Sequence, residues 1–148
     1  FRVSHDAADP IGINVFAGNQ KVTVLTDSGE VDDRMLRYLD DTTMLVLEAN
    51  YDPHMLKFGP YDRFLKERVA GPQGHLSNDA TAQALLMMKR PNFMQVILAH
   101  RSENNNHPFP VTQTIGNMLV QGGVRIGPEM KLQHGQPNEC VSMVEVTK

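Results

Sequence analysis

Cysteine, excess basic charge and long apolar runs are all scarce in this sequence of 148 residues. The single cysteine, Cys140, excludes an internal disulfide and a cysteine-rich zinc cluster, so we expect a reducing, cytoplasmic location. No apolar run approaches the roughly 20 residues that a membrane-spanning helix requires, so we expect no membrane partner. The formal net charge is −3 at pH 7 and the basic residues are scattered, so a nucleic acid would need a local binding site.

Glycine-rich phosphate-binding motifs are also absent, which disfavours a nucleotide-cradling loop. Strands and helices alternate instead. Short β-rich apolar runs predict strands at 13–17, 21–27, 43–50 and 94–100, with Gly18 and Asn19 turning the first into the second. Apolar residues at helical spacing predict helices after Glu30 and after Asn78. This alternation predicts one α/β domain over residues 1–148.

The remaining segments are less regular. Residues 52–72 predict short helices in a long excursion, and residues 101–110 predict a polar loop. A helix is expected at about 111–121, followed by a closing strand in "ECVSMVEVT", residues 139–147. The chain opens without Met inside what we interpret as a strand, so we expect it to be a piece of a longer protein.

Three predicted strands end in a side chain that can bind a metal: His5 in "VSHD", Asp27 in "LTDSG" and His100 in "LAHRS". In an open α/β sheet, sites gather at the carboxyl ends of strands, so these three could converge. Imidazole nitrogen and carboxylate oxygen suit cations such as zinc, and a carboxylate can bridge two metals. Each residue alone is more commonly an ordinary turn residue, so the spacing indicates the site without proving it.

Two further residues could take part in chemistry. Glu48 follows four apolar residues, where a buried carboxylate needs a cation, a donor or a proton. His75 lies just before a helix that Asn78 could cap, and a helix N-terminus favours an anion. A packed structural histidine is an equally good interpretation of His75. The other histidines, His54, His107 and His134, lie in polar, loop-like settings where we expect them to be solvated.

Five segments in order resemble the YycJ (WalJ) type of metallo-β-lactamase-fold hydrolase: "VSHDAADPIG", "VLTDSG", "LVLEANYDPHML", "GPYDRFLKERVAGPQGHLSNDATAQAL" and "VILAHRSENNN". Less closely, "GHLSNDATAQA" followed by "LAHRS" is similar to ribonuclease Z and its phosphodiesterase relatives. The resemblance implies the four-layer αββα sandwich, of which this chain would be about the carboxyl-terminal half. Nothing here resembles the His-x-His-x-Asp-His cluster of the family's amino-terminal half, which supplies four further metal ligands.

The resemblance also implies roles for the candidate residues. His5, Asp27 and His100 would be metal ligands, with Asp27 bridging two divalent ions, zinc or manganese. His75 would meet the scissile phosphate, and Glu48 would orient it. The implied function is a metal-dependent phosphodiesterase that uses a metal-activated water, with DNA as the expected substrate, and the chain alone should be inactive. Two alternatives remain: a non-catalytic half-domain that needs a partner chain, and an ester or lactone hydrolase of the same fold.

Overall fold

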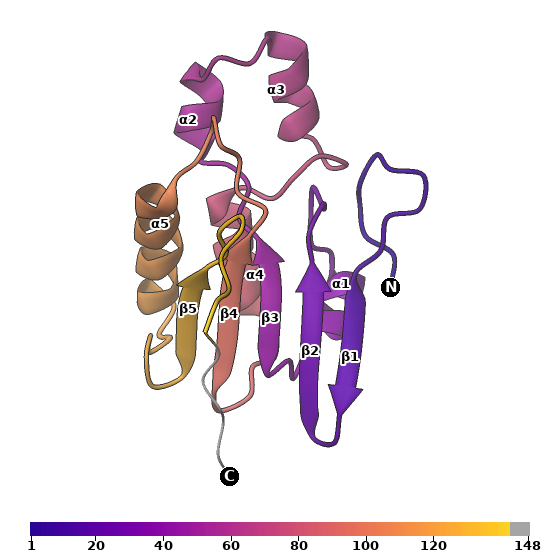
Figure 1. The fold of residues 1–148 in the computed structure, drawn as a ribbon, viewed down its shortest axis with the longest axis vertical. Helices are drawn as coiled ribbons and strands as arrows, with labels where there is room; N and C mark the ends of the chain where they lie inside the picture. The colour runs from indigo at the N-terminus through magenta and orange to yellow at the C-terminus, as the bar shows by residue number, and fades with distance from the viewer. Residues whose placement is uncertain (143–148) are drawn as a thin grey trace.

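A five-stranded sheet runs through the computed structural model, which describes residues 1–142 (Figure 1). Its strands lie in chain order: β1 (Ile13–Ala17), β2 (Gln20–Leu25), β3 (Met44–Glu48), β4 (Met94–Ala99) and β5 (Met130–His134). β1 and β2 form an antiparallel hairpin, and β2 through β5 are parallel. Parallel neighbours need crossover connections, so their carboxyl ends all meet at one edge of the sheet.

Helices supply these crossovers. The sequence patterns place α1 (Asp33–Leu39) between β2 and β3, and α5 (Pro108–Gln121) between β4 and β5. Three helices connect β3 to β4: α2 (Pro53–Phe58), α3 (Arg63–Val69) and α4 (Asn78–Met87). α2 and α3 form an excursion beyond the carboxyl ends of the strands, as Figure 1 shows. No helix in the described part of the chain is long and apolar enough to cross a bilayer.

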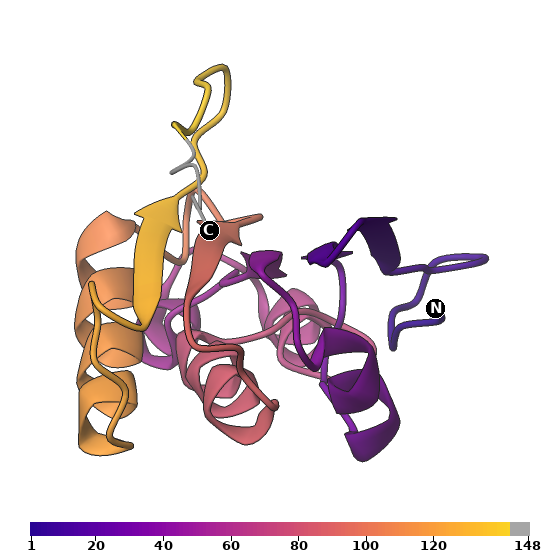
Figure 2. The same cartoon turned by 90° about the horizontal axis from the view of Figure 1, so that it is seen from below.

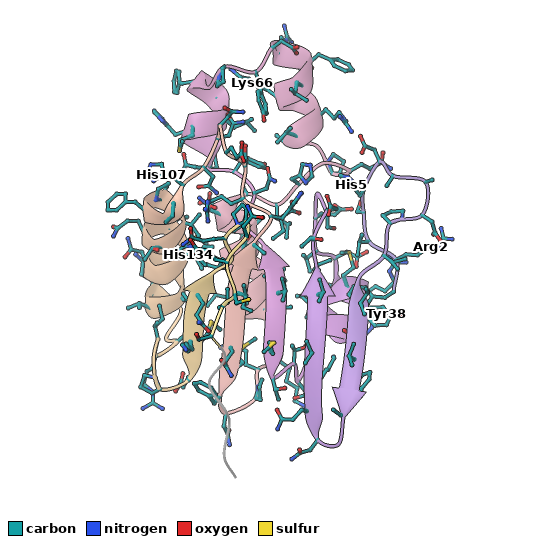
Figure 3. The ribbon with its side chains drawn as sticks, viewed as in Figure 1. Arg2, His5, Tyr38, Lys66, His107 and His134 are labelled. Atoms are coloured by element: carbon teal, nitrogen blue, oxygen red, sulfur yellow. The ribbon has the colours of Figure 1, made fainter. Side chains whose placement is uncertain are left out.

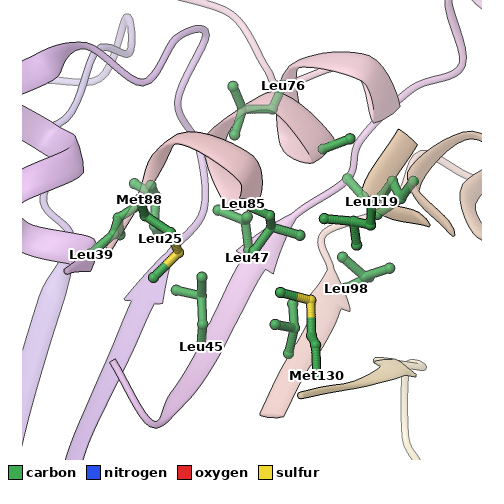
Figure 4. Close-up of a cluster of buried hydrophobic side chains, with 14 of the residues drawn as sticks. Leu25, Leu39, Leu45, Leu47, Leu76, Leu85, Met88, Leu98, Leu119 and Met130 are labelled. Atoms are coloured by element: carbon green, nitrogen blue, oxygen red, sulfur yellow. The ribbon is translucent and has the colours of Figure 1, made fainter. Parts of the chain in front are cut away.

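The core lies on one face of the sheet. α1, α4 and α5 all cover that face (Figure 2). Buried leucines of β3, Leu45 and Leu47, meet buried leucines of the helices there, among them Leu85 of α4 and Leu119 of α5 (Figure 4). On the other face, Val24, Val46 and Ile97 pair side by side and stay partly exposed, with no helix from residues 1–142 over them. The layer order is therefore helices on a sheet with one apolar face left open.

Side-chain caps begin several helices. Asp32, Asp52 and Asp62 each accept a hydrogen bond from the backbone N–H three residues on, at the starts of α1, α2 and α3. The prediction that Asn78 caps α4 was wrong. Ser77 is the cap, because its Oγ accepts from the N–H of Ala80 at 3.1 Å. Asn78 is the first helical residue instead, buried and hydrogen-bonded to the side chain of Asn106.

The two ends of the chain also differ from expectation. Residues 1–12 form a loop with a single bridge between Arg2 and Ile11, so His5 does not end a regular strand. Residues 139–142 are not a strand, and residues 143–147 of the predicted closing strand lie outside the described residues. The last strand among residues 1–142 is β5, formed by residues 130–134, which pairs with β4. Of the predicted turn residues, Gly18 takes a positive φ of 59° and Asn19 does not.

Candidate metal and hydrolytic site

Two of the predicted metal ligands, Asp27 and His100, have an unusual backbone conformation just after a strand ends. Asp27 lies two residues after β2, with φ of 56°, and His100 follows β4 directly, with φ of 49°. Non-glycine residues in this left-handed region are uncommon, and such conformations cluster at functional sites. Here they turn both side chains toward the same edge of the sheet. His5 reaches that edge from the amino-terminal loop (Figure 3).

The carboxylate of Asp27 lies close to both histidines. Its Oδ1 is 4.0 Å from Nε2 of His5 and 3.6 Å from Nε2 of His100. Nδ1 of His5 is 2.9 Å from the carbonyl oxygen of Gly74, a contact that fixes the ring and turns Nε2 toward two carboxylates, Oδ1 of Asp6 at 3.5 Å and Oδ1 of Asp27 at 4.0 Å. The structure thus brings His5, Asp27 and His100 together, and their role as ligands stays a prediction.

Glu48 contacts two of the site histidines from the buried side of the cluster. Its side chain has no exposed surface, and Oε1 is 2.7 Å from Nδ1 of His75 and 2.6 Å from Nδ1 of His100. Oε2 accepts from the N–H of Ser28 at 3.0 Å. A carboxylate that accepts from Nδ1–H sets the tautomer and leaves Nε2 as the free nitrogen. The predicted pairing of Glu48 with His75 is therefore present, and a second pairing, with His100, was not foreseen.

Opposing effects act on the charges of this cluster. Burial is the largest single effect on Glu48 and raises its pKa, but hydrogen bonds from His100, His75 and the Ser28 N–H together hold it below the usual value. The hydrogen bond to Glu48 raises the pKa of His100, against the smaller effect of burial. Glu48 is therefore a buried anion that hydrogen bonding keeps ionised.

His75 lies between the other two site histidines. Its ring centroid is 5.0 Å from that of His5 and 5.2 Å from that of His100, and 21% of its side chain is exposed. Gly74 holds this position, because a Cβ there would lie 2.2 Å from the Arg68 carbonyl oxygen and 2.3 Å from that of Val69. Glycine is thus required immediately before the histidine. The imidazole ring of His75 therefore faces the site and does not serve only to pack against the loop.

An open cavity of about 370 Å³ lies over these residues. His5, His75 and His100 line it together with Tyr61, Leu65 and Arg68 of the excursion, so α3 forms a wall of the site. Arg68 donates to Asp6 at 2.6 Å through Nε and 3.1 Å through Nη2, which ties α3 to the loop that carries His5. Asp6 and Arg68 were not predicted, since 62 positions separate them and no local pattern links them.

The donor set fits a divalent cation. Ligand atoms of His5, Asp27 and His75 lie within 4.8 Å of one another, as do those of Glu48, His75 and His100. In the second group Glu48 is sealed from solvent and already accepts from both imidazoles, so it suits an orienting carboxylate better than a ligand. In the first group nitrogen and oxygen atoms face open space, which suits zinc or manganese. The structure thus adds His75 as a possible ligand.

The other three histidines lie away from this cluster. His54 and His107 are exposed, as expected. The prediction that His134 is solvated was wrong: it ends β5, its Nε2 is 2.9 Å from Oγ1 of Thr112, and its Nδ1 is buried. Contact with α5 leaves the residue partly buried, and the sequence, which predicts a loop there, gives no sign of that strand.

Comparison with known proteins agrees with the resemblance found in the sequence. No protein-family model matches the chain. Exodeoxyribonuclease WalJ of Streptococcus pneumoniae is 31% identical over 146 residues, which cover 99% of this chain and 54% of that protein. Exodeoxyribonuclease YycJ of Bacillus anthracis is 31% identical over 137 residues, covering 93% and 52%. The chain spans about half the length of these curated relatives.

The solved structures include the metallo-β-lactamase fold protein YhfI from Bacillus subtilis, with a TM-score of 0.61 and 10% identity. That match covers 92% of this chain and 45% of YhfI. The sequence likeness confirms the predicted resemblance, and the structural likeness confirms the predicted fold class.

Proposed function

We propose that this chain, which has the metallo-β-lactamase fold and resembles the WalJ and YycJ exodeoxyribonucleases, forms part of a metal-dependent deoxyribonuclease. One observation carries the proposal: Oδ1 of Asp27 lies 4.0 Å from Nε2 of His5 and 3.6 Å from Nε2 of His100, and the Nδ1 atoms of the two rings contact Gly74 and Glu48. Such backing by second partners is the usual support of metal-binding histidines. The names of the relatives support DNA as the substrate.

His5, Asp27 and His100 would hold the metal, with Asp27 shared between two ions. Divalent cations held there would lower the pKa of water and neutralise phosphoryl oxygens, the two requirements of phosphodiester hydrolysis at neutral pH. Three side chains leave a dinuclear centre short of ligands. The others would come from the part of the relatives that this chain does not span, so residues 1–148 would form a partial domain.

His75 would act directly on the substrate. Glu48 holds its Nδ1, so Nε2 is the atom available to hydrogen-bond a phosphate oxygen or to protonate the leaving oxygen. Glu48 itself is buried beneath the two rings, so it is a positioning residue that sets the orientation of both His75 and His100. The cavity above the rings is open enough to admit a phosphodiester.

The test is hydrolysis by the complete protein that carries this chain, supplied with Mn²⁺ or Zn²⁺. Linear DNA and bis(p-nitrophenyl) phosphate are compared with p-nitrophenyl acetate. We expect degradation of DNA and turnover of the phosphodiester, both abolished by a chelator and restored by metal. Ester turnover without phosphodiester turnover would contradict the proposal and favour the ester hydrolase. Residues 1–148 alone should bind metal weakly and show no hydrolysis, because the ligand set is incomplete.

A further inference from the structure

Arg101 lies beside the candidate metal site and has no partner for its charge among the described residues. It follows His100 in the chain, so its Cα is about 3.8 Å from that of His100. Its side chain is partly buried, and Nη1 of the guanidinium is sealed from solvent without a hydrogen-bond partner in residues 1–142. No ion pair described for that part of the chain includes it. Burying a hydrogen-bond donor without a partner costs free energy of folding, so the unpaired guanidinium indicates a binding site for an anion.

A second cavity, of about 630 Å³, adjoins the first at this residue. His100, Arg101 and Glu103 line both cavities and so form the wall that they share. The far side of the second cavity is formed by the start of α5, at His107 and Pro108, and by residues 135–137 after β5. A chain-like molecule lying over the histidines could therefore continue past Arg101 into this second space.

The charges around Arg101 leave it positive. Burial lowers the pKa of His134, and the nearby charge of Arg101 lowers it further, so both effects favour the neutral ring. An imidazole carries no negative charge whether it is neutral or protonated, so His134 cannot balance the guanidinium. Nδ1 of His134 is also buried without a partner among the described residues. Glu103 is the acidic residue on the shared wall; it is exposed, and no ion pair with Arg101 is described for residues 1–142. The shared wall thus offers an uncompensated cation.

We propose that the second cavity binds the nucleotide next to the scissile phosphodiester of a DNA strand, with Arg101 donating hydrogen bonds to its phosphate. The inference rests on the proposed function and deepens it, because it makes the substrate a polynucleotide rather than a small phosphodiester. A DNA strand places one phosphate per 3.4 Å of axial rise. A strand held at His75 and His100 must therefore carry another phosphate close by, and the planar guanidinium suits a phosphate through paired N–H donors.

Binding measured without turnover tests the subsite directly. A fluorescein-labelled single-stranded 12-mer is titrated with the complete protein in chelator, and anisotropy is followed over a range of KCl concentrations. We expect Arg101→Ala to weaken binding about tenfold and to reduce the slope of log K against log salt by about one, the effect of one lost phosphate contact. Arg101→Lys should keep the slope but bind less tightly. Arg34→Ala, an exposed arginine on α1 that lines neither cavity, is the matched control and should leave both quantities unchanged.

Glu103→Gln gives a prediction of opposite sign. Removing this negative charge from the shared wall should tighten DNA binding two- to fivefold. If Arg101 has only a structural role, the affinity for DNA should not increase. Unchanged or weaker binding by this variant counts against the subsite. A salt slope that is the same for Arg101→Ala and the wild type would overturn it.

Turnover then separates this inference from the proposed function. With Mn²⁺ present, the kcat/KM loss of Arg101→Ala on the 12-mer should exceed its loss on bis(p-nitrophenyl) phosphate at least fivefold and lie mainly in KM. Equal losses on both substrates would overturn the subsite and leave the nuclease standing. A wild type that binds the 12-mer with an Arg101-dependent slope but never degrades DNA would overturn the nuclease and support the subsite.

Discussion

The carboxylate of Glu48 and the imidazole of His100 meet at 2.6 Å, and the same imidazole presents Nε2 to Asp27 at 3.6 Å. A fully buried anion thus sits directly behind an atom that faces the candidate metal site. Because Glu48 also holds His75, one carboxylate aligns both a proposed ligand and a proposed catalytic group. Single substitutions in this group of residues should therefore reduce catalysis more than stability.

Glu48→Gln should slow DNA hydrolysis by about 10- to 100-fold, the usual effect of removing the partner of a metal-binding histidine. The amide keeps the size of the side chain but gives up the charge that fixes the two Nδ1–H groups. Steady-state kinetics and metal content are measured together. Activity within twofold of the wild type would show that Glu48 does not position the histidines.

Asp27→Asn should lower the metal content of the purified protein without changing the melting temperature of the metal-free form. The carboxylate makes no hydrogen bond described for residues 1–142, so its loss removes a ligand and weakens only two long ion-pair contacts, at 4.0 Å to His5 and 3.6 Å to His100. Metal is measured by mass spectrometry. Asp33→Asn, exposed on α1, is the control and should keep its metal. Full metal content in Asp27→Asn would exclude the bridging role.

His75→Ala should reduce turnover by about 10²- to 10⁴-fold, as loss of a positioned acid does, with a modest fall in the melting temperature because the buried Glu48 loses one hydrogen-bond donor. His54→Ala, exposed on α2, should be silent in both assays. If His75→Ala keeps its turnover but melts earlier, the residue is structural. If the metal leaves together with the activity, His75 is a ligand rather than a proton donor.

Gly74→Ala should destabilise the protein by about 2 kcal/mol or more, because the new methyl group meets two backbone oxygens that cannot give way. Gly116→Ala should do the opposite. That glycine lies inside α5, where an added Cβ meets only the Ile126 side chain at 3.9 Å, so we expect a gain of about 0.5–1 kcal/mol. Chemical denaturation measures both. Equal effects of the two changes would contradict this account of the backbone at Gly74.

The sequence allowed most of the sheet to be predicted, because the first four of its five described strands are short β-rich runs bounded by turn residues. Asp27 and His100 could be placed at strand ends for the same reason. His5 was expected at a strand end too, but a loop delivers it, and its partner Gly74 lies 69 positions away. Contacts of that range are set by the packed fold and leave no local periodicity.

Other features were missed for related reasons. The choice of Ser77 over Asn78 as the cap of α4 depends on burial of Asn78 against Asn106, which one sequence does not reveal. The second partner of Glu48 and the ion pair between Asp6 and Arg68 join segments far apart in the chain, and the burial of the unpaired Nη1 of Arg101 depends on how the packed fold surrounds it. The resemblance to a known fold was what related His75 to the site before the structure did.

His5, Asp27 and His100 are proposed to bind metal at one point. Anomalous diffraction from crystals of the complete protein grown with Mn²⁺, recorded at the manganese edge, tests it most directly. We expect a peak bonded to an Asp27 oxygen and to Nε2 of His5 or His100, at about 2.0–2.3 Å, with Glu48 outside bonding distance. A peak bonded to Glu48 instead, or none within reach of Asp27, would contradict it.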